Sequence, residues 1–147
     1  MSLKDRLLED MKAAMKQKDV VKKNTVQMTR AAILQVEKDN KITLDDDGVI
    51  DVISKEVKKR KSVLPEYEKS GRQDLIDVLN REAEILQSYL PEQMSEQELE
   101  NIVKQTIEDV GASGMKDMGK VMAAIMPKVR GRADGNAVNG FVKKCLV

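Results

Sequence analysis

The sequence predicts an all-α protein, in which an N-terminal four-helix portion with a long helical hairpin precedes a small C-terminal three-helix bundle. Apolar residues recur along the chain at the three- and four-residue spacing of a buried helix face. Capping residues precede these stretches, and glycine or proline follows them. We find no convincing strand pattern, so we expect only helices and short connections.

The first two helices are expected over residues 3–17 and from Asp19 to about Glu37. Ser2 and Asp19 can cap them, because their side-chain oxygens reach the free amides of a first turn. The residues expected to face inward are Leu3, Leu7, Met11, Ala14 and Met15 in the first helix, and Thr25, Met28, Ala32, Ile33 and Val36 in the second.

A long hairpin is expected next, from Thr43 to Leu90. Thr43 opens its first helix, and Pro65 is expected to kink or split that helix, because proline lacks an amide donor and crowds the preceding turn. Gly71 is a natural stop, after which the second helix runs from about Arg72 to Leu90.

The segment Pro91–Ser95 is the predicted domain boundary, which gives an N-terminal helical domain of residues 1–91 and a C-terminal three-helix domain of residues 92–147. It combines a helix stop, a short polar connection and the start of a capping box formed by Ser95 and Glu98. The three expected C-terminal helices run from Ser95 to Gly111, from Gly114 to about Met126 before Pro127, and from Asp134 onward.

The composition excludes several site chemistries. The chain has no histidine, so it cannot form a Ser-His-Asp triad or an imidazole metal site. Its single cysteine, Cys145, excludes an internal disulfide and a multi-thiolate metal site. Aromatic residues make up only 2% of the chain, which disfavours binding of single strands by base stacking. We therefore predict no catalytic residue, no metal and no bound cofactor.

The chain contains no run of about 18 apolar residues, which predicts that it does not span a membrane. Residues 1–10 lead directly into charged, helix-periodic sequence, without the apolar region of a secretory signal peptide. We therefore expect a cytoplasmic location.

Basic charge is concentrated in residues 115–147, which carry seven basic and two acidic side chains, a net charge of +5 in a chain whose total is +1. Such asymmetry bears on partners more than on fold. This basic charge has two interpretations. It either contacts the phosphates of a nucleic acid or forms a face that is solvated or paired within the unit. Cations in a loop favour the first, because a helical bundle offers them few partners and binding residues gather in loops. The candidate RNA- or partner-binding residues are Lys116, Lys120, Lys128, Arg130, Arg132 and Lys143, of which Lys128, Arg130 and Arg132 are expected in a loop.

Three stretches of this region, KDMGKVM (116–122), MPKV (126–129) and GRADG (131–135), resemble the signature of the GatB/YqeY family in sequence and spacing. The opening SLKDRLLEDMKAAMK, the EKSGRQDL turn and the YLPEQMSEQEL junction look like the free-standing YqeY-type proteins, so the resemblance covers essentially the whole chain. It implies that the C-terminal part is similar to the tail domain of the B subunit of the tRNA-dependent amidotransferase. That tail contacts the outer body of tRNA, and amide transfer needs other parts of the complex.

Two further motifs are incomplete. The glycines of Gly114-x-x-x-x-Gly119-Lys120 approach a phosphate-binding loop, but Val121 replaces its hydroxyl residue and no strand precedes it, so Gly119 is expected to serve close helix packing. An acidic stretch near Gly48 approaches a calcium loop without its bidentate glutamate, and is interpreted as an acidic helix start.

Three functions remain open on the sequence. The first is a non-catalytic helical accessory protein that binds tRNA, or a tRNA-processing enzyme complex, through the Lys116–Arg132 surface. The second is a protein–protein adapter without RNA, which uses the Thr43–Leu90 hairpin or a face of regularly spaced methionines, Met115, Met118, Met122 and Met126. The third is carbon–nitrogen ligase activity with glutamine as amido-N-donor, only as part of a complex. The sequence leaves the oligomeric state open.

Overall fold

A computed structural model describes residues 1–147. It contains seven α-helices, one short 3-10 helix and no strand, which confirms the all-α prediction. The chain divides into two compact units, Met1–Leu90 and Pro91–Val147. The elements are α1 (Leu3–Lys16), α2 (Val20–Asn40), α3 (Asp46–Ser70), α4 (Gln73–Gln87), α5 (Glu96–Val110), η1 (Met115–Asp117), α6 (Met118–Val129) and α7 (Gly135–Leu146).

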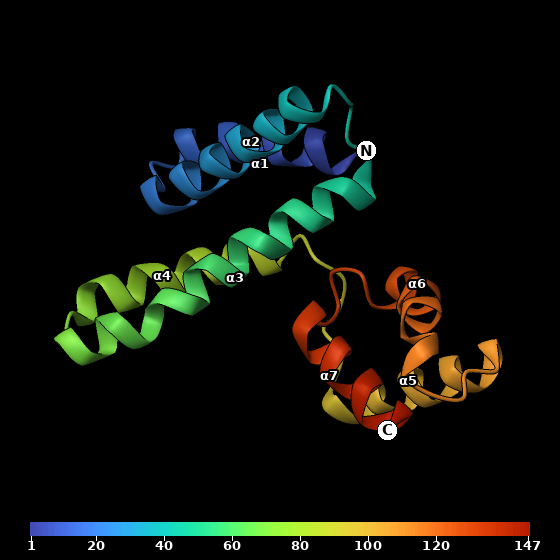
Figure 1. The fold of residues 1–147 in the computed structure, drawn as a ribbon. Coiled ribbons are helices and arrows are strands. Elements are labelled where there is room, and N and C mark those ends of the chain that lie inside the picture. The colour runs from blue at the N-terminus through green and yellow to red at the C-terminus, as the bar shows by residue number, and fades with distance from the viewer. The chain divides into compact units, whose positions relative to one another are not determined.

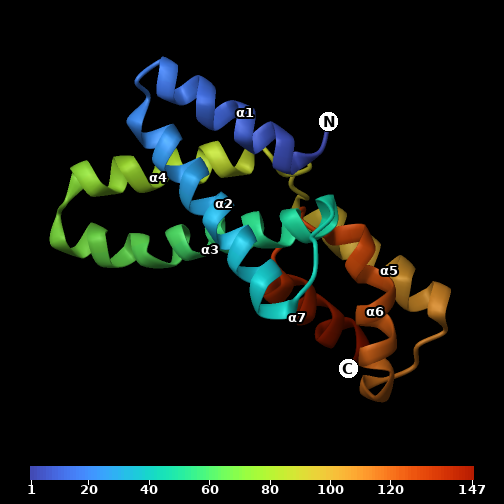
Figure 2. The same ribbon diagram turned by 90° about the horizontal axis from the view of Figure 1, so that it is seen from above.

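The first unit consists of two helix pairs. Figures 1 and 2 both show α3 and α4 as a long hairpin, with α1 and α2 packed against its inner part. The inward-facing aliphatic residues of all four helices form one core, because each helix has a single apolar face to bury. The buried core residues are Leu7, Val26, Ile33, Val49, Val52, Ile53, Val57, Leu86 and Tyr89.

Local hydrogen bonds fix where these helices begin. The amide of Asp5 donates to the Ser2 hydroxyl at 3.1 Å, so Ser2 caps α1 as expected. The α3 helix begins later than predicted, because Asp45 and not Thr43 is its cap, with a 2.9 Å bond from the amide of Gly48. Each cap satisfies an amide that its helix leaves free.

Two positions expected in the core are exposed. Met15 is 55% exposed and Met28 is 60% exposed. Helical spacing predicted an inward face wide enough to include both. The residues that are buried, such as Ala14 in α1 and Thr29 in α2, show that the covered face is narrower than the spacing predicted.

Pro65 does not split α3, which runs from Asp46 to Ser70 as one helix. Proline removes the bond that its position would donate to the carbonyl of Lys61. Both Pro65 and Lys61 are exposed, so water can satisfy that carbonyl.

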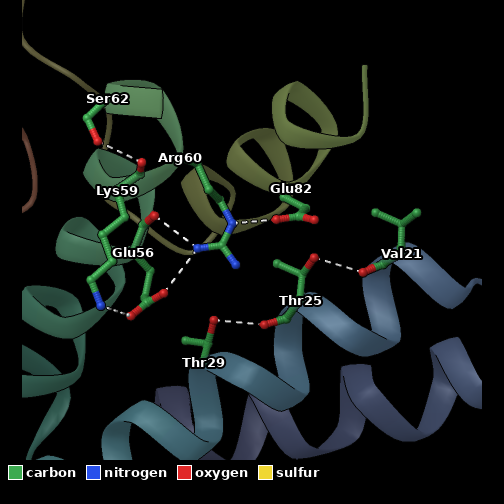
Figure 3. Close-up of polar contacts among 8 residues, drawn as sticks. All are labelled: Val21, Thr25, Thr29, Glu56, Lys59, Arg60, Ser62 and Glu82. Carbon is green, nitrogen blue, oxygen red and sulfur yellow. Dashed lines mark hydrogen bonds and ion pairs between the residues drawn. The ribbon is translucent and has the colours of Figure 1, made fainter. Parts of the chain in front are cut away.

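Charged side chains are buried where α2, α3 and α4 meet (Figure 3). Arg60 is 6% exposed and donates from Nε to Glu82 on α4 at 2.7 Å and from Nη1 to Glu56 at 3.1 Å. Thr25 and Thr29 of α2 are also buried, but their hydroxyls bond to carbonyls one turn back in their own helix. The two glutamates are therefore the charge partners of Arg60, and Glu82 ties α4 to α3.

Tyr89, just after α4, ties that end of the hairpin to α1. Its buried phenol donates to the carboxylate of Asp10, and the guanidinium of Arg6 lies 4.6 Å from the ring centroid. Arg6 also donates to the carbonyl of Ser88 at 3.3 Å. Burial, and then the bond to Asp10, raise the pKa of Tyr89 above its ordinary value.

Replacing Arg60 with Met should lower the free energy of unfolding of the first unit by about 3 kcal/mol, because Glu56 and Glu82 would lose their buried countercharge. Both tyrosines of the chain, Tyr67 and Tyr89, lie in this unit. Tyrosine emission during a urea titration therefore reports the unfolding of this unit alone.

The matched control is Arg72→Met, which breaks the exposed ion pair with Asp74 and should change the free energy of unfolding by less than about 0.5 kcal/mol. Equal losses in the two variants would contradict a special role for the buried Arg60.

Replacing Tyr89 with Phe should destabilise the first unit by about 1–2 kcal/mol at neutral pH, because the bond to Asp10 is lost. A raised pKa in the folded state stabilises the fold below about pH 10, where the unfolded phenol is protonated, and this stabilisation disappears as the pH rises further. The wild type should therefore lose its advantage over the variant above about pH 10 in urea titrations followed by circular dichroism. A constant difference would contradict this role of the phenol.

Candidate nucleic-acid interface

All six candidate cations lie in the second unit, which is formed by α5, η1, α6 and α7. Ser95 caps α5 by accepting a 3.1 Å bond from the amide of Glu98, as the capping box predicted. One apolar core joins the three α-helices. Its buried residues are Leu99, Val103, Val121, Ile125, Val129, Val138, Val142 and Leu146.

The α6 helix is longer than predicted, because it continues through Pro127 to Val129 and does not end at about Met126. Val129 is 1% exposed, so its burial holds the last turn against the core. Ala123, whose carbonyl would have bonded to residue 127, is exposed and can bond to water.

Lys128 consequently lies on a helix and not in the loop where we expected it. Its Nζ lies 3.3 Å from the hydroxyl of Thr106 and 4.0 Å from the carboxylate of Asp109, both on α5. Part of the basic charge is therefore paired within the unit, which was the simpler interpretation of this stretch. The Lys128 side chain is still 45% exposed.

Arg132, in the loop before α7, is bound to the start of the unit. Its Nε donates to the carbonyl of Glu92 at 2.8 Å, and Nη2 lies 3.7 Å from the carboxylate of Glu98. Two more bonds join the same segments, from the amide of Met94 to the Arg132 carbonyl at 2.8 Å and from the Gln93 amide group to the Gly131 carbonyl at 2.6 Å. The Arg132 guanidinium is therefore occupied in holding the 92–94 segment against the loop.

Arg130 stands at the C-terminal end of α6, where its amide donates to the carbonyl of Met126 at 3.0 Å. The residue is half-buried. The loop that was expected to present three cations thus contains two, Arg130 and Arg132, both partly covered.

Two exposed lysines, Lys116 on η1 and Lys120 in the first turn of α6, precede and follow Gly119 in the chain. Asp117, an acidic side chain between them in sequence, accepts a bond from the amide of Ser113 at 2.9 Å. This bond, assisted by the nearby lysine charges, lowers the pKa of Asp117 below its ordinary value. Asp117 therefore stays ionised and bound to its own loop.

Gly119 has no packing role, contrary to our expectation. A Cβ built at this position meets no atom within 4 Å, and the residue is exposed. A glycine inside a helix makes the helix less stable than an alanine would, by up to about 1 kcal/mol. The stability of the fold therefore gives no reason for a glycine at position 119. Sequence spacing could not reveal this openness, which depends on what packs beside α6.

Lys143 is exposed on α7. The methionine face is divided: Met115 and Met126 are exposed, whereas Met118 and Met122 pack against the core. No group of His, Cys, Asp or Glu side chains is arranged to hold a metal ion, and none of the helices is both long and apolar enough for a transmembrane span.

Comparison with known proteins identifies one family model, described as Yqey-like protein, which matches residues 4–146. Altered inheritance of mitochondria protein 41, mitochondrial, from Pyrenophora tritici-repentis is 29% identical over 87% of this chain and 71% of its own length. The Vanderwaltozyma polyspora protein of the same name is 32% identical over 76% of this chain and 64% of its own length. The glutamyl-tRNA(Gln) amidotransferase of Thermococcus gammatolerans has an E subunit that is 40% identical over 57 residues, which are 39% of this chain and 9% of that protein.

These relatives contradict the cytoplasmic location predicted from the sequence, because the relatives from Pyrenophora and Vanderwaltozyma are named mitochondrial proteins. The prediction relied on the lack of an apolar region near the first residue. That observation bears on secretion only, since leaders for import into mitochondria are amphipathic and rich in arginine and serine.

Replacing Arg132 with Met should loosen the 92–94 segment, because the bond to the Glu92 carbonyl is lost. The amide of Met94 should exchange its hydrogen about tenfold faster, while amides in the middle of α5 keep their rates. Nuclear magnetic resonance at the residue level measures both. Unchanged exchange at Met94 would show that the backbone bonds alone hold the segment.

Proposed function

This chain belongs to the Yqey-like protein family, and on that premise we propose that it is a non-catalytic helical accessory protein that binds tRNA through the second unit. The proposed contact residues are Lys116 on η1 and Gly119 and Lys120 in the first turn of α6, with Lys143 on α7 as a further cation. Arg132 and Lys128 are not among the proposed contacts, because their charged groups already bond within the unit, to the Glu92 carbonyl and to Thr106.

One observation carries the proposal, namely the open backbone at Gly119 between two exposed lysines. Glycine allows a ligand to approach a helix backbone closely, since no Cβ stands in the way. The first turn of a helix adds free amides and a positive dipole end. The ammonium groups of the lysines that precede and follow Gly119 in the chain suit the phosphates of a nucleic-acid backbone.

The few aromatic rings favour a folded RNA over a single strand. Stacking of unpaired bases requires an accessible ring, but Tyr89 is 4% exposed and Phe141 packs against the core of the second unit. The third ring, Tyr67, is partly exposed but belongs to the first unit. A folded RNA such as tRNA can be recognised by the fixed positions of its phosphates, without stacking.

The amidotransferase relative supports tRNA as the folded RNA, because its name states glutamyl-tRNA(Gln) as the substrate of its complex. This chain corresponds to only a small part of that relative. Carbon–nitrogen ligase activity with glutamine as donor would therefore require other chains. In such a complex, this protein would bind the tRNA on which those chains act.

A protein partner without RNA is the second candidate, favoured by the exposed side chains of Met115 and Met126. Flexible, polarizable methionine adapts to varied apolar surfaces. Purification from cells separates the two candidates, because a protein partner would remain bound after ribonuclease treatment.

Charge reversal of Lys116 and Lys120 to Glu should weaken binding of deacylated tRNA, and should reduce the slope of log affinity against log salt by about 2, since two phosphate contacts are lost. Fluorescence anisotropy at several salt concentrations measures both quantities. The matched control reverses Lys12 and Lys16, which are exposed on α1. If both double variants weakened tRNA binding equally, the effect would come from net charge alone and the proposed contact at Lys116 and Lys120 would be wrong.

Replacing Gly119 with Ala tests the open backbone without adding charge. The variant should fold at least as stably as the wild type, with a gain of up to about 1 kcal/mol, because a Cβ meets no atom there. It should nevertheless bind tRNA more weakly, because the methyl group holds the phosphate away from the helix. Unchanged affinity would refute close approach at Gly119.

A further inference from the structure

The turn that joins α1 to α2 is rich in lysine. It lies at the end of this helix pair opposite the N-terminus (Figures 1 and 2). Residues 12–23 carry five basic side chains and one acidic side chain, a net charge of +4 in a chain whose total is +1. The first three of these lysines are exposed and the last two are half-buried: Lys12, Lys16, Lys18, Lys22 and Lys23.

The single acidic side chain of this turn is already engaged. Asp19 accepts a bond from Nη2 of Arg81 on α4 at 2.6 Å and another from the amide of Lys22 at 3.2 Å. On α4, Arg81 is flanked by Asp77 four residues before it and Glu84 three residues after it. Counted with these three side chains of α4, the surface has six basic and three acidic groups, so its net charge is +3.

The other end of the same helix pair shows what helix ends alone produce. The negative end of the helix dipole favours a cation in the last turn. Lys16 and Lys38 occupy the last turns of α1 and α2. Lys18 and Lys41 follow them with left-handed backbones, at φ of 58° and 53°. Residues 37–47, however, carry two basic and five acidic side chains, a net charge of −3, so the helix dipole does not explain the excess positive charge at the α1–α2 turn.

Two exposed aliphatic side chains lie among these lysines. Met15 is 55% exposed and Val20 is 62% exposed. Met15 shares a face of α1 with Lys12, three residues earlier, and Val20 shares a face of α2 with Lys23, three residues later. Single exposed aliphatic residues are ordinary on a protein surface, but each of these stands beside a cation of its own helix. The turn thus presents apolar side chains within a basic surface.

An anionic lipid surface fits both properties of this turn. Lysine is attracted to the phosphates of anionic headgroups, and its apolar stem can lie along apolar surface while the ammonium stays in water. Methionine and valine beside it can enter the boundary between headgroups and acyl chains. A nucleic acid would match the charge but would leave Met15 and Val20 against a hydrated phosphate backbone, so a lipid surface is favoured.

We propose that the α1–α2 turn binds the surface of a membrane that contains anionic lipid, with its lysines at the headgroup phosphates and with Met15 and Val20 inserted between the headgroups. Such a contact lies at the surface of the bilayer and does not require a membrane-spanning helix, of which the structure shows none. It is reversible and depends on salt, since each lysine near an anionic surface strengthens binding only about fivefold. This inference is independent of the proposed RNA contact, which lies in the other unit.

Sedimentation of the full chain with sucrose-loaded vesicles tests the proposal. The wild type should bind vesicles of phosphatidylcholine with about 30% phosphatidylglycerol at about 1 mM lipid, and should bind pure phosphatidylcholine about tenfold more weakly or worse. Lys16→Gln combined with Lys18→Gln should weaken binding to the anionic vesicles about 25-fold, because two lysines are lost. Val20→Thr changes little in shape but adds a hydroxyl, and should weaken binding about threefold.

The matched control combines Lys38→Gln with Lys41→Gln, which removes the equivalent two lysines at the other end of the helix pair. It has the same net charge as the first double variant and should bind anionic vesicles within about twofold of the wild type, because these lysines lie among acidic side chains. Circular dichroism verifies that every variant keeps its helices.

Three results would overturn the proposal. The first is no binding to anionic vesicles at about 1 mM lipid and low salt. The second is an equal loss in the two double variants, or no loss in either, since lipid would then respond to net charge or to another part of the chain. The third is a loss of tRNA binding, with vesicle binding unchanged, on substitution of Lys16 and Lys18, which would make the turn a nucleic-acid surface.

Discussion

The buried charge of Arg60 constrains how the helices of the first unit can be arranged. A guanidinium that is only 6% exposed must meet carboxylates, and one of them, Glu82, comes from the other helix of the hairpin. Sliding α4 along α3 by one turn, about 5.4 Å, would separate that pair. The same register brings Tyr89 to Asp10 and Arg6 of α1, so the ion pair and the aliphatic core select one arrangement together.

Cations in the second unit divide into two roles. Arg132 and Lys128 hold segments of the unit together, through the Glu92 carbonyl and through α5. Lys116 and Lys120 stay exposed beside Gly119, where no side chain competes for space. A positive net charge therefore does not by itself identify a phosphate-binding surface. The cations available to a ligand are those that the fold has not already engaged.

Local sequence predicted the helices well and their edges less well. The Ser95 cap lies where expected, because a cap involves groups only three residues apart. Pro65 and Pro127 were expected to interrupt helices that in fact continue, since exposed carbonyls can replace the lost bonds with water. Whether water can reach a carbonyl depends on neighbouring helices, which the periodicity of one segment does not describe.

The sequence by itself determined the all-α class, the order of the helices, the basic C-terminal stretch and the family, because each rests on residues close together in the chain or on direct similarity. Only the tertiary structure decided that Arg132 is tied to Glu92, that Gly119 is open, and that none of residues 61–80 is buried. These features depend on which distant segments lie side by side. That pairing results from the packing of whole helices, so no local pattern of residues specifies it.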